Sequence, residues 1–122
     1  MRILADIAVF AVALLQLSFM ALEIFLWNKA AGLKIHRFKP EFADKTRTLA
    51  ANQGLYNGFL AAGLIWSLLN EQLALDLQVF LLACVITAGV FGGATASRLI
   101  LWVQALPGII ALLLVFLAQS TY

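Results

Sequence analysis

The stretch ILADIAVFAVALLQLSFMALEIFLW, residues 3–27, decides the fold of this chain. As an α-helix it is about 37 Å long, which is enough to cross the hydrocarbon core of a bilayer with some tilt. It is longer than a typical signal-peptide core, it contains Asp6, and Glu23 and bulky residues stand where a cleavage site requires small ones. We therefore expect these residues to form a first transmembrane helix.

The rest of the chain continues this pattern. Of its 122 residues, 64% are hydrophobic and only 11% are charged, far from the composition of a soluble domain. Three further apolar runs cover residues 49–69, 75–96 and 99–118, each close to the roughly 20 residues that a span requires. We expect a helix to begin at Pro40 and to run into the second span. The predicted fold class is all-α: one integral membrane domain, residues 1–122, folded as a four-helix transmembrane bundle.

The Lys and Arg residues are distributed unevenly along the chain. Six of the eight lie in the segment 28–48, and Arg98, in a very tight turn expected between the third and fourth spans, adds a seventh on the same side. Arg2 is the one Lys or Arg residue expected on the other side of the membrane. Because Lys and Arg accumulate in cytoplasmic loops, we expect 28–48 to be a basic cytoplasmic loop and both termini to lie outside. Membrane lipids are the expected surroundings, and we expect no nucleic-acid partner.

The sequence offers few residues for metal or redox chemistry. Cys84 is the only cysteine and lies in an apolar run, and His36 is the only histidine and is read as a loop residue. One thiol cannot form an intrachain disulfide or a multi-thiolate metal site. We expect no metal and no cofactor, and no motif commits the chain to a reaction, so whether it is an enzyme stays open.

Small residues recur at intervals of four in two of the spans. Such stripes allow helix backbones to approach closely in lipid. We expect helix contacts at them, and we expect the chain to form a homo-oligomer. The residues are Gly54, Gly58 and Ala62 in the second span and Gly89, Gly93 and Ser97 in the third.

Polar residues converge in the cytoplasmic half of the predicted bundle. Glu23 lies four residues before Trp27, about 6 Å inside the expected boundary, and Gln16 lies two turns deeper on the same face. In the fourth span, Pro107 lacks a backbone N–H, which frees a carbonyl, and is expected to kink the helix. The candidate ligand-binding residues are Glu23, Asn52, Gln53, Tyr56, Asn57, Arg98 and Gln104.

Two interpretations of this polar group stay open. A carboxylate in lipid costs about 2.5 to 3.5 kcal/mol at the helix centre and less near the interface, so Glu23 is expected to face inward. It can hold helices together by pairing with Arg98 or by accepting hydrogen bonds from Asn52 and Gln53 of the second span. Alternatively, the group binds a lipophilic or amphiphilic small molecule.

Two segments of the chain resemble a known family. They are FADKTRTLAANQGLYNGFLAAGLIW, residues 42–66, and VFGGATASRLILWVQALPGIIALLL, residues 90–114, with NQGLYNG and QALPGI as the most specific parts. Together they resemble a family of small four-span bacterial membrane proteins known only as a domain of unknown function. The resemblance extends over nearly the whole chain. It implies a multi-pass fold in the cytoplasmic (inner) membrane of a bacterium, and no known activity.

The chain also resembles, more weakly, the membrane-associated eicosanoid and glutathione metabolism proteins, which are trimeric four-helix enzymes. That resemblance implies roles for Arg47, Asn52 and Tyr56. The sequence departs from this family's pattern in two ways. It lacks the acidic residue that the pattern has after the asparagine, and the spacing from Arg47 to Asn52 is one residue longer than in the pattern.

Two further classes of function stay open. In a small proton-coupled exporter, Glu23 would be the coupling carboxylate, although it lies near the boundary and the strong Lys and Arg bias opposes dual insertion. A non-enzymatic accessory protein would use the small-residue stripes to bind another membrane protein. The function that we expect is the binding of a lipophilic or amphiphilic ligand at the cytoplasmic leaflet.

Overall fold

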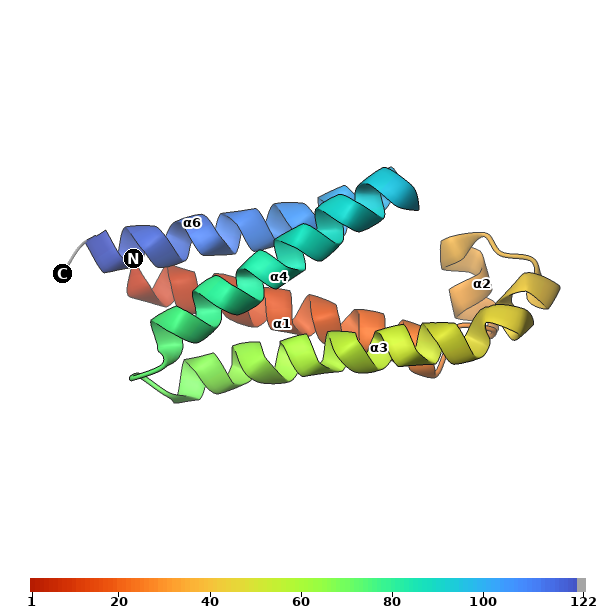
Figure 1. Ribbon diagram of the computed structural model, residues 1–122, viewed down its shortest axis with the longest axis horizontal. Coiled ribbons are helices and arrows are strands. Elements are labelled where there is room, and N and C mark those ends of the chain that lie inside the picture. The colour runs from red at the N-terminus through yellow and green to blue at the C-terminus, as the bar shows by residue number, and fades with distance from the viewer. Residues whose placement is uncertain (121–122) are drawn as a thin grey trace. The chain divides into compact units, whose positions relative to one another are not determined.

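Residues 1–120, which the computed structural model describes, form helices joined by short turns and contain no strand (Figure 1). The prediction of an all-α chain is therefore confirmed for this part. Residues 121 and 122, the end of the predicted domain, lie outside the described residues. The elements in chain order are α1 (Arg2–Ile24), α2 (Ala30–His36), α3 (Pro40–Leu69), α4 (Ala74–Thr95), α5 (Arg98–Ile100), the π-helical turn η1 (Leu101–Ala105) and α6 (Leu106–Ser120).

Within the described residues, three helices are long and apolar enough to cross a membrane: α1, α4 and the continuous helix Arg98–Ser120. They coincide with the first, third and fourth predicted spans to within about three residues, which is the usual uncertainty at helix ends. Helix α3 contains the second predicted span but is not among the three. Its amides at positions 52, 53 and 57 make it less apolar than the others.

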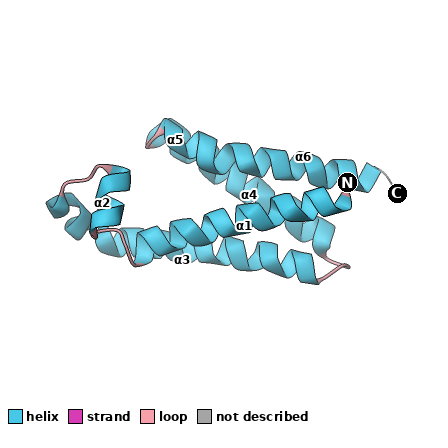
Figure 2. Cartoon of the chain, turned by 180° about the vertical axis from the view of Figure 1, so that it is seen from behind, coloured by secondary structure: helices cyan, strands magenta, loops and turns pink. Residues whose placement is uncertain are grey.

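The ends of the helices follow local sequence signals. Helix α3 begins at Pro40, as predicted, because the fixed φ of proline suits a first turn and its missing N–H is not needed there. A short loop joins α3 to α4 (Figure 2). In this loop the backbone N–H of Leu73 donates to the side chain of Asn70 at 3.1 Å.

The turn between α4 and α5 is as tight as predicted. The backbone N–H groups of Ala96 and Ser97 both donate to the carbonyl of Gly92, at 2.8 and 3.1 Å. The hydroxyl of Ser97 then accepts from the N–H of Leu99 and caps the next helix. The helix widens just before Pro107 into the π-helical turn η1, where the N–H of Leu106 donates to the carbonyl of Leu101.

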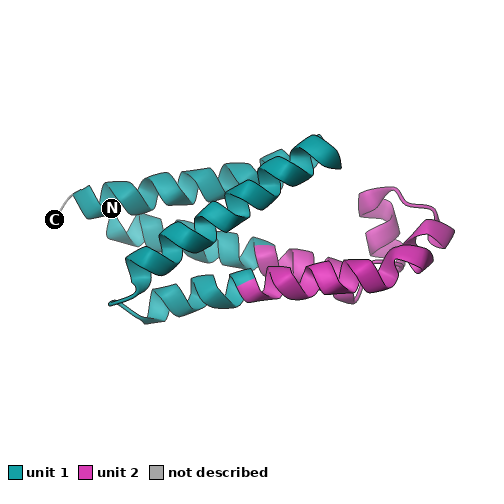
Figure 3. Cartoon of the chain, in the orientation of Figure 1, with its two compact units in different colours: residues 1–15, 60–122 teal, residues 16–59 magenta. Residues whose placement is uncertain are grey.

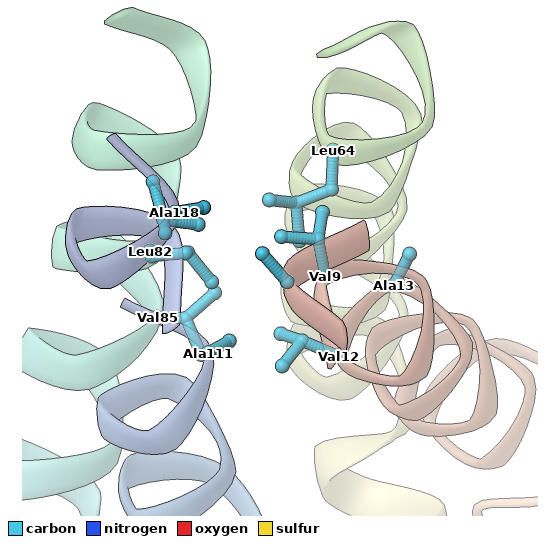
Figure 4. Packing of buried hydrophobic residues seen from close by; sticks show 10 residues of the cluster. Val9, Val12, Ala13, Leu64, Leu82, Val85, Ala111 and Ala118 are labelled. Carbon is cyan, nitrogen blue, oxygen red and sulfur yellow. The ribbon is translucent and has the colours of Figure 1, made fainter. Parts of the chain in front are cut away.

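The described chain divides into two compact units (Figure 3). Unit 1 contains residues 1–15 and 60–122, and unit 2 contains residues 16–59. Unit 1 has its own hydrophobic core, in which side chains from α1 and the end of α3 point toward those of α4 and α6 (Figure 4). Eight of the ten fully buried members are alanine or valine, and the other two are leucine. The ten are Ala5, Val9, Val12, Ala13, Leu64, Leu82, Val85, Ala111, Val115 and Ala118.

The second small-residue stripe is largely confirmed within unit 1. A Cβ added at Gly89 would lie 2.5 Å from the backbone nitrogen of Ala105, and one at Gly93 would lie 2.2 Å from Cγ of Leu101. Ser97 is not part of this contact, because α4 ends at Thr95 and Ser97 caps α5 instead.

Candidate functional site

Unit 2 contains the end of α1 and most of α3, which approach each other at two glycines. A Cβ added at Gly54 would lie 2.8 Å from Cγ1 of Ile24 and 3.0 Å from Cβ of Glu23. One added at Gly58 would lie 2.7 Å from the sulfur of Met20. The first small-residue stripe is therefore a helix contact at both glycines.

The third member of that stripe, Ala62, is exposed, whereas Ala61 is fully buried. A spacing of four residues rotates by about 40° per step on a helix of 3.6 residues per turn, so a strict four-residue stripe leaves the buried face. The buried residues of α3 that follow Gly54 are instead Asn57 and Ala61.

Glu23 and Asn57 form the polar centre of unit 2. The side-chain amide of Asn57 donates a hydrogen bond to the carboxylate of Glu23 across the two helices. Asn57 is only 6% exposed, and Glu23 is partly buried. The sequence predicted Asn52 and Gln53 as the donors to Glu23, whereas the donor in the structure is Asn57.

The other three polar residues of this stretch lie on the surface of the chain. Asn52, Gln53 and Tyr56 are exposed, and the ring of Tyr56 packs edge-on against Phe59 with centroids 5.8 Å apart. They belong to the same two turns of α3 as Asn57 but present their side chains away from the Glu23 contact. Whether they bind a ligand stays a prediction.

Gln16 is buried one turn before Met20 on α1. It is 1% exposed, and its side-chain carbonyl oxygen has no hydrogen-bond partner among the described residues. It lies seven residues before Glu23, so both acceptors occupy one face of the helix.

The remaining two candidate residues belong to unit 1. Arg98 is exposed at the start of α5, and Gln104 is 8% exposed within the π-helical turn. Unit 1 also contains the ion pair between Arg2 and Asp6, at 3.5 Å. A role for Arg98 and Gln104 in ligand binding stays a prediction.

The segment expected to be a basic loop is folded. Helix α2 packs so closely that a Cβ added at Gly32 would lie 2.0 Å from the carbonyl oxygen of Leu26. His36 is the last residue of α2, not a loop residue, and its ring lies 4.7 Å from that of Trp27. Trp27 in turn donates a hydrogen bond to Thr46 at 2.9 Å. We call residues 27–47 the basic cap.

Aromatic rings form a partly exposed cluster in the basic cap. The ring of Phe38 stacks on His36 at 5.2 Å and meets Trp27 and Phe42 edge-on at 5.0 and 4.8 Å. Sequence reasoning missed this cluster, although the spacing of four aromatic or imidazole rings within 16 residues was a signal for it.

No group of three or more His, Cys, Asp or Glu residues that could hold a metal ion occurs among residues 1–120.

Comparison with known proteins places the chain in a family. A family described as "Protein of unknown function (DUF1304)" matches residues 10–116. An uncharacterised protein, YpaA of Lactococcus lactis subsp. lactis (strain IL1403), is 30% identical over 115 residues, which cover 93% of this chain and 97% of the relative. No solved structure matches significantly. The resemblance expected from the NQGLYNG and QALPGI segments is thus confirmed at the level of a family of unknown function, and the chain belongs to the DUF1304 family.

Proposed function

We propose that this protein spans the inner membrane of a bacterium four times, as a helical bundle with both termini outside and the basic cap in the cytoplasm. The three apolar helices and the excess of Lys and Arg in residues 28–48 support this topology. Helix α3 supplies the fourth span through residues 49–69, which as a helix are about 30 Å long.

Within this protein, unit 2 binds an amphiphilic ligand through Glu23 and Asn57. One observation carries the proposal: a carboxylate lies inside a helix apolar enough to span a membrane, and its hydrogen-bond partner is a neutral amide. Ionisable residues within spans are costly and are usually functional. An amide satisfies one acceptor site of the carboxylate and leaves its charge unbalanced.

The surrounding groups indicate the chemistry of the ligand. Glu23 and the unpaired oxygen of Gln16 are both acceptors on one face of α1, which favours a headgroup that donates hydrogen bonds, such as an ammonium. On α3, the exposed rings of Tyr56 and Phe59 provide apolar surface for an alkyl chain, and Asn52 and Gln53 provide further polar contacts.

A binding experiment with a defined probe tests this proposal. The purified chain in a neutral detergent is titrated with a fluorescent long-chain alkylamine, and with the alkyl alcohol of the same length as competitor. Wild type should bind the amine, and Glu23→Gln should weaken binding by about ten-fold, or about 1.4 kcal/mol. The matched control is Asp6→Asn, which removes a partly exposed carboxylate, paired with Arg2, from the same helix and should bind normally.

Equal binding by wild type and Glu23→Gln would contradict the proposal. So would an alcohol that competes as well as the amine, since the carboxylate would then play no part in recognition.

The same carboxylate favours one second candidate, a proton-coupled exporter of cationic amphiphiles. An exporter exchanges protons for its substrate at an intramembrane carboxylate, and Glu23, which contacts a second helix through Asn57, would have that role. Proteoliposomes loaded with a lipophilic cation distinguish the two candidates, because only an exporter would release the cation when a pH gradient is imposed.

A further inference from the structure

The basic cap carries its cations on the surface. All six Lys and Arg side chains are exposed, against two carboxylates. Of these carboxylates, Asp44 accepts a hydrogen bond from Asn28 at 3.0 Å. The cap therefore presents a surplus of unpaired positive charge to its surroundings. The six residues are Lys29, Lys34, Arg37, Lys39, Lys45 and Arg47.

Apolar side chains are exposed among these cations. Ile35 on α2 is 53% exposed and Phe42 on α3 is 50% exposed, beside Lys34 and Glu41 in the sequence. A surface that mixes exposed apolar side chains with Lys and Arg suits the boundary of a bilayer, where the apolar groups enter the acyl region and the cations reach the headgroups.

The basic cap also has a defined structure of its own, without a bound partner. Gly32 packs against the backbone of Leu26, and the indole of Trp27 is tied to Thr46. Cations held on a preformed frame lose less conformational entropy on binding than cations on a flexible loop.

We propose that the basic cap binds the headgroups of anionic phospholipids at the cytoplasmic face of the membrane. The charge complementarity between the six cations and lipid phosphates carries the proposal, and clusters of this size next to a membrane span attract anionic lipid. The inference rests on the membrane insertion proposed above, but not on the ligand at Glu23.

The test measures lipid retention by the full chain. Protein in neutral detergent is titrated with phosphatidylglycerol or with phosphatidylcholine, and bound lipids are counted by native mass spectrometry. Wild type should retain the anionic lipid, and Lys34→Gln should weaken retention by roughly five-fold, with a larger loss in the triple variant Lys29→Gln, Lys34→Gln, Lys39→Gln. Added salt should weaken retention as well.

Three controls keep the result interpretable. Arg2→Gln removes a cation outside the cap and should not change retention of phosphatidylglycerol. The triple Lys→Arg variant keeps the charges and should retain it fully. Glu23→Gln should also retain it, so that failure of the ligand proposal and failure of this one give different results.

The proposal would be overturned by equal retention of the two lipids, or by a triple Lys→Gln variant that behaves like wild type. Loss of retention in the triple Lys→Arg variant would show that charge is not the cause. Displacement of phosphatidylglycerol by an equal concentration of inorganic phosphate would assign the surface to a soluble anion instead.

Discussion

The amide of Asn57 donates a hydrogen bond to the carboxylate of Glu23, which joins α1 and α3 across 34 residues of sequence. Gly54, one turn earlier on α3, leaves room for Glu23 at the contact. At the depth proposed for this pair in the membrane, no water would replace a lost partner, so the pair would hold the two helices of unit 2 in one register.

Replacing Asn57 should therefore cost more stability than replacing its exposed neighbour on the same helix. Asn57→Ala leaves a partly buried carboxylate without its donor and should lower the free energy of unfolding by about 1 to 2 kcal/mol. Asn52→Ala removes an exposed amide and should change it by less than about 0.5 kcal/mol. Unfolding in mixed detergent and SDS, followed by circular dichroism, measures both. A larger loss for Asn52→Ala than for Asn57→Ala would contradict the assigned contact.

Two glycines in unit 1 provide a second comparison with an identical substitution. The Cβ of Gly89→Ala would lie 2.5 Å from backbone nitrogen of Ala105, which cannot move alone, so we expect a loss of about 1 to 3 kcal/mol. The Cβ of Gly63→Ala would meet the end of the Leu81 side chain at 2.6 Å, which can rotate away. Alanine has a better helix propensity than glycine by about 1 kcal/mol, which should offset the cost of moving the Leu81 side chain.

The same unfolding assay decides this prediction. If Gly63→Ala destabilised the protein as much as Gly89→Ala, the close approach of α4 to η1 would not be a rigid backbone contact.

The positions of the long helices could be predicted because hydrocarbon thickness fixes how many apolar residues a span needs. Pro40 gave the start of α3 for an equally local reason. The sequence did not show which amide faces α1. The i, i+4 pairs in NQGLYNG place the polar side chains on two faces of the helix, but they do not show which face packs against α1. Tertiary contact decides between them: Asn57 shares the buried face with Gly54 and Ala61.

The basic cap was beyond sequence reasoning for a different reason. Helix α2 has seven residues, too few to be stable alone or to show a clear hydrophobic period. It forms because Gly32 fits against the carbonyls of Leu26 and Trp27, a contact that no local pattern reports.

A single methyl group at Gly32 should accordingly open the basic cap. Gly32→Ala places a Cβ 2.0 Å from the carbonyl oxygen of Leu26, and overpacking of this kind costs about 1 to 3 kcal/mol, so local opening should become about ten-fold more frequent or more. Trypsin, which cleaves after Lys34, Arg37 and Lys39, measures that opening in detergent.

The matched control for this experiment is Ala31→Ser at the neighbouring exposed position, which should be cleaved at the wild-type rate. Wild-type cleavage of Gly32→Ala would mean that α2 is not held by its contact with Leu26.

The topology leads to the last prediction, which also tests whether α3 crosses the membrane. In a Cys84→Ala background, single cysteines at the exposed positions Lys34, Gln72 and Ser97 are treated with a membrane-impermeant maleimide in intact cells. The excess of Lys and Arg in the basic cap and at Arg98 places positions 34 and 97 inside, so only position 72 should be labelled. After the cells are opened, all three should react.

Labelling of positions 34 and 97 but not 72 in intact cells would show that the protein has the opposite orientation in the membrane. If positions 34 and 72 behaved alike, α3 would not be a span, because one position precedes α3 in the chain and the other follows it.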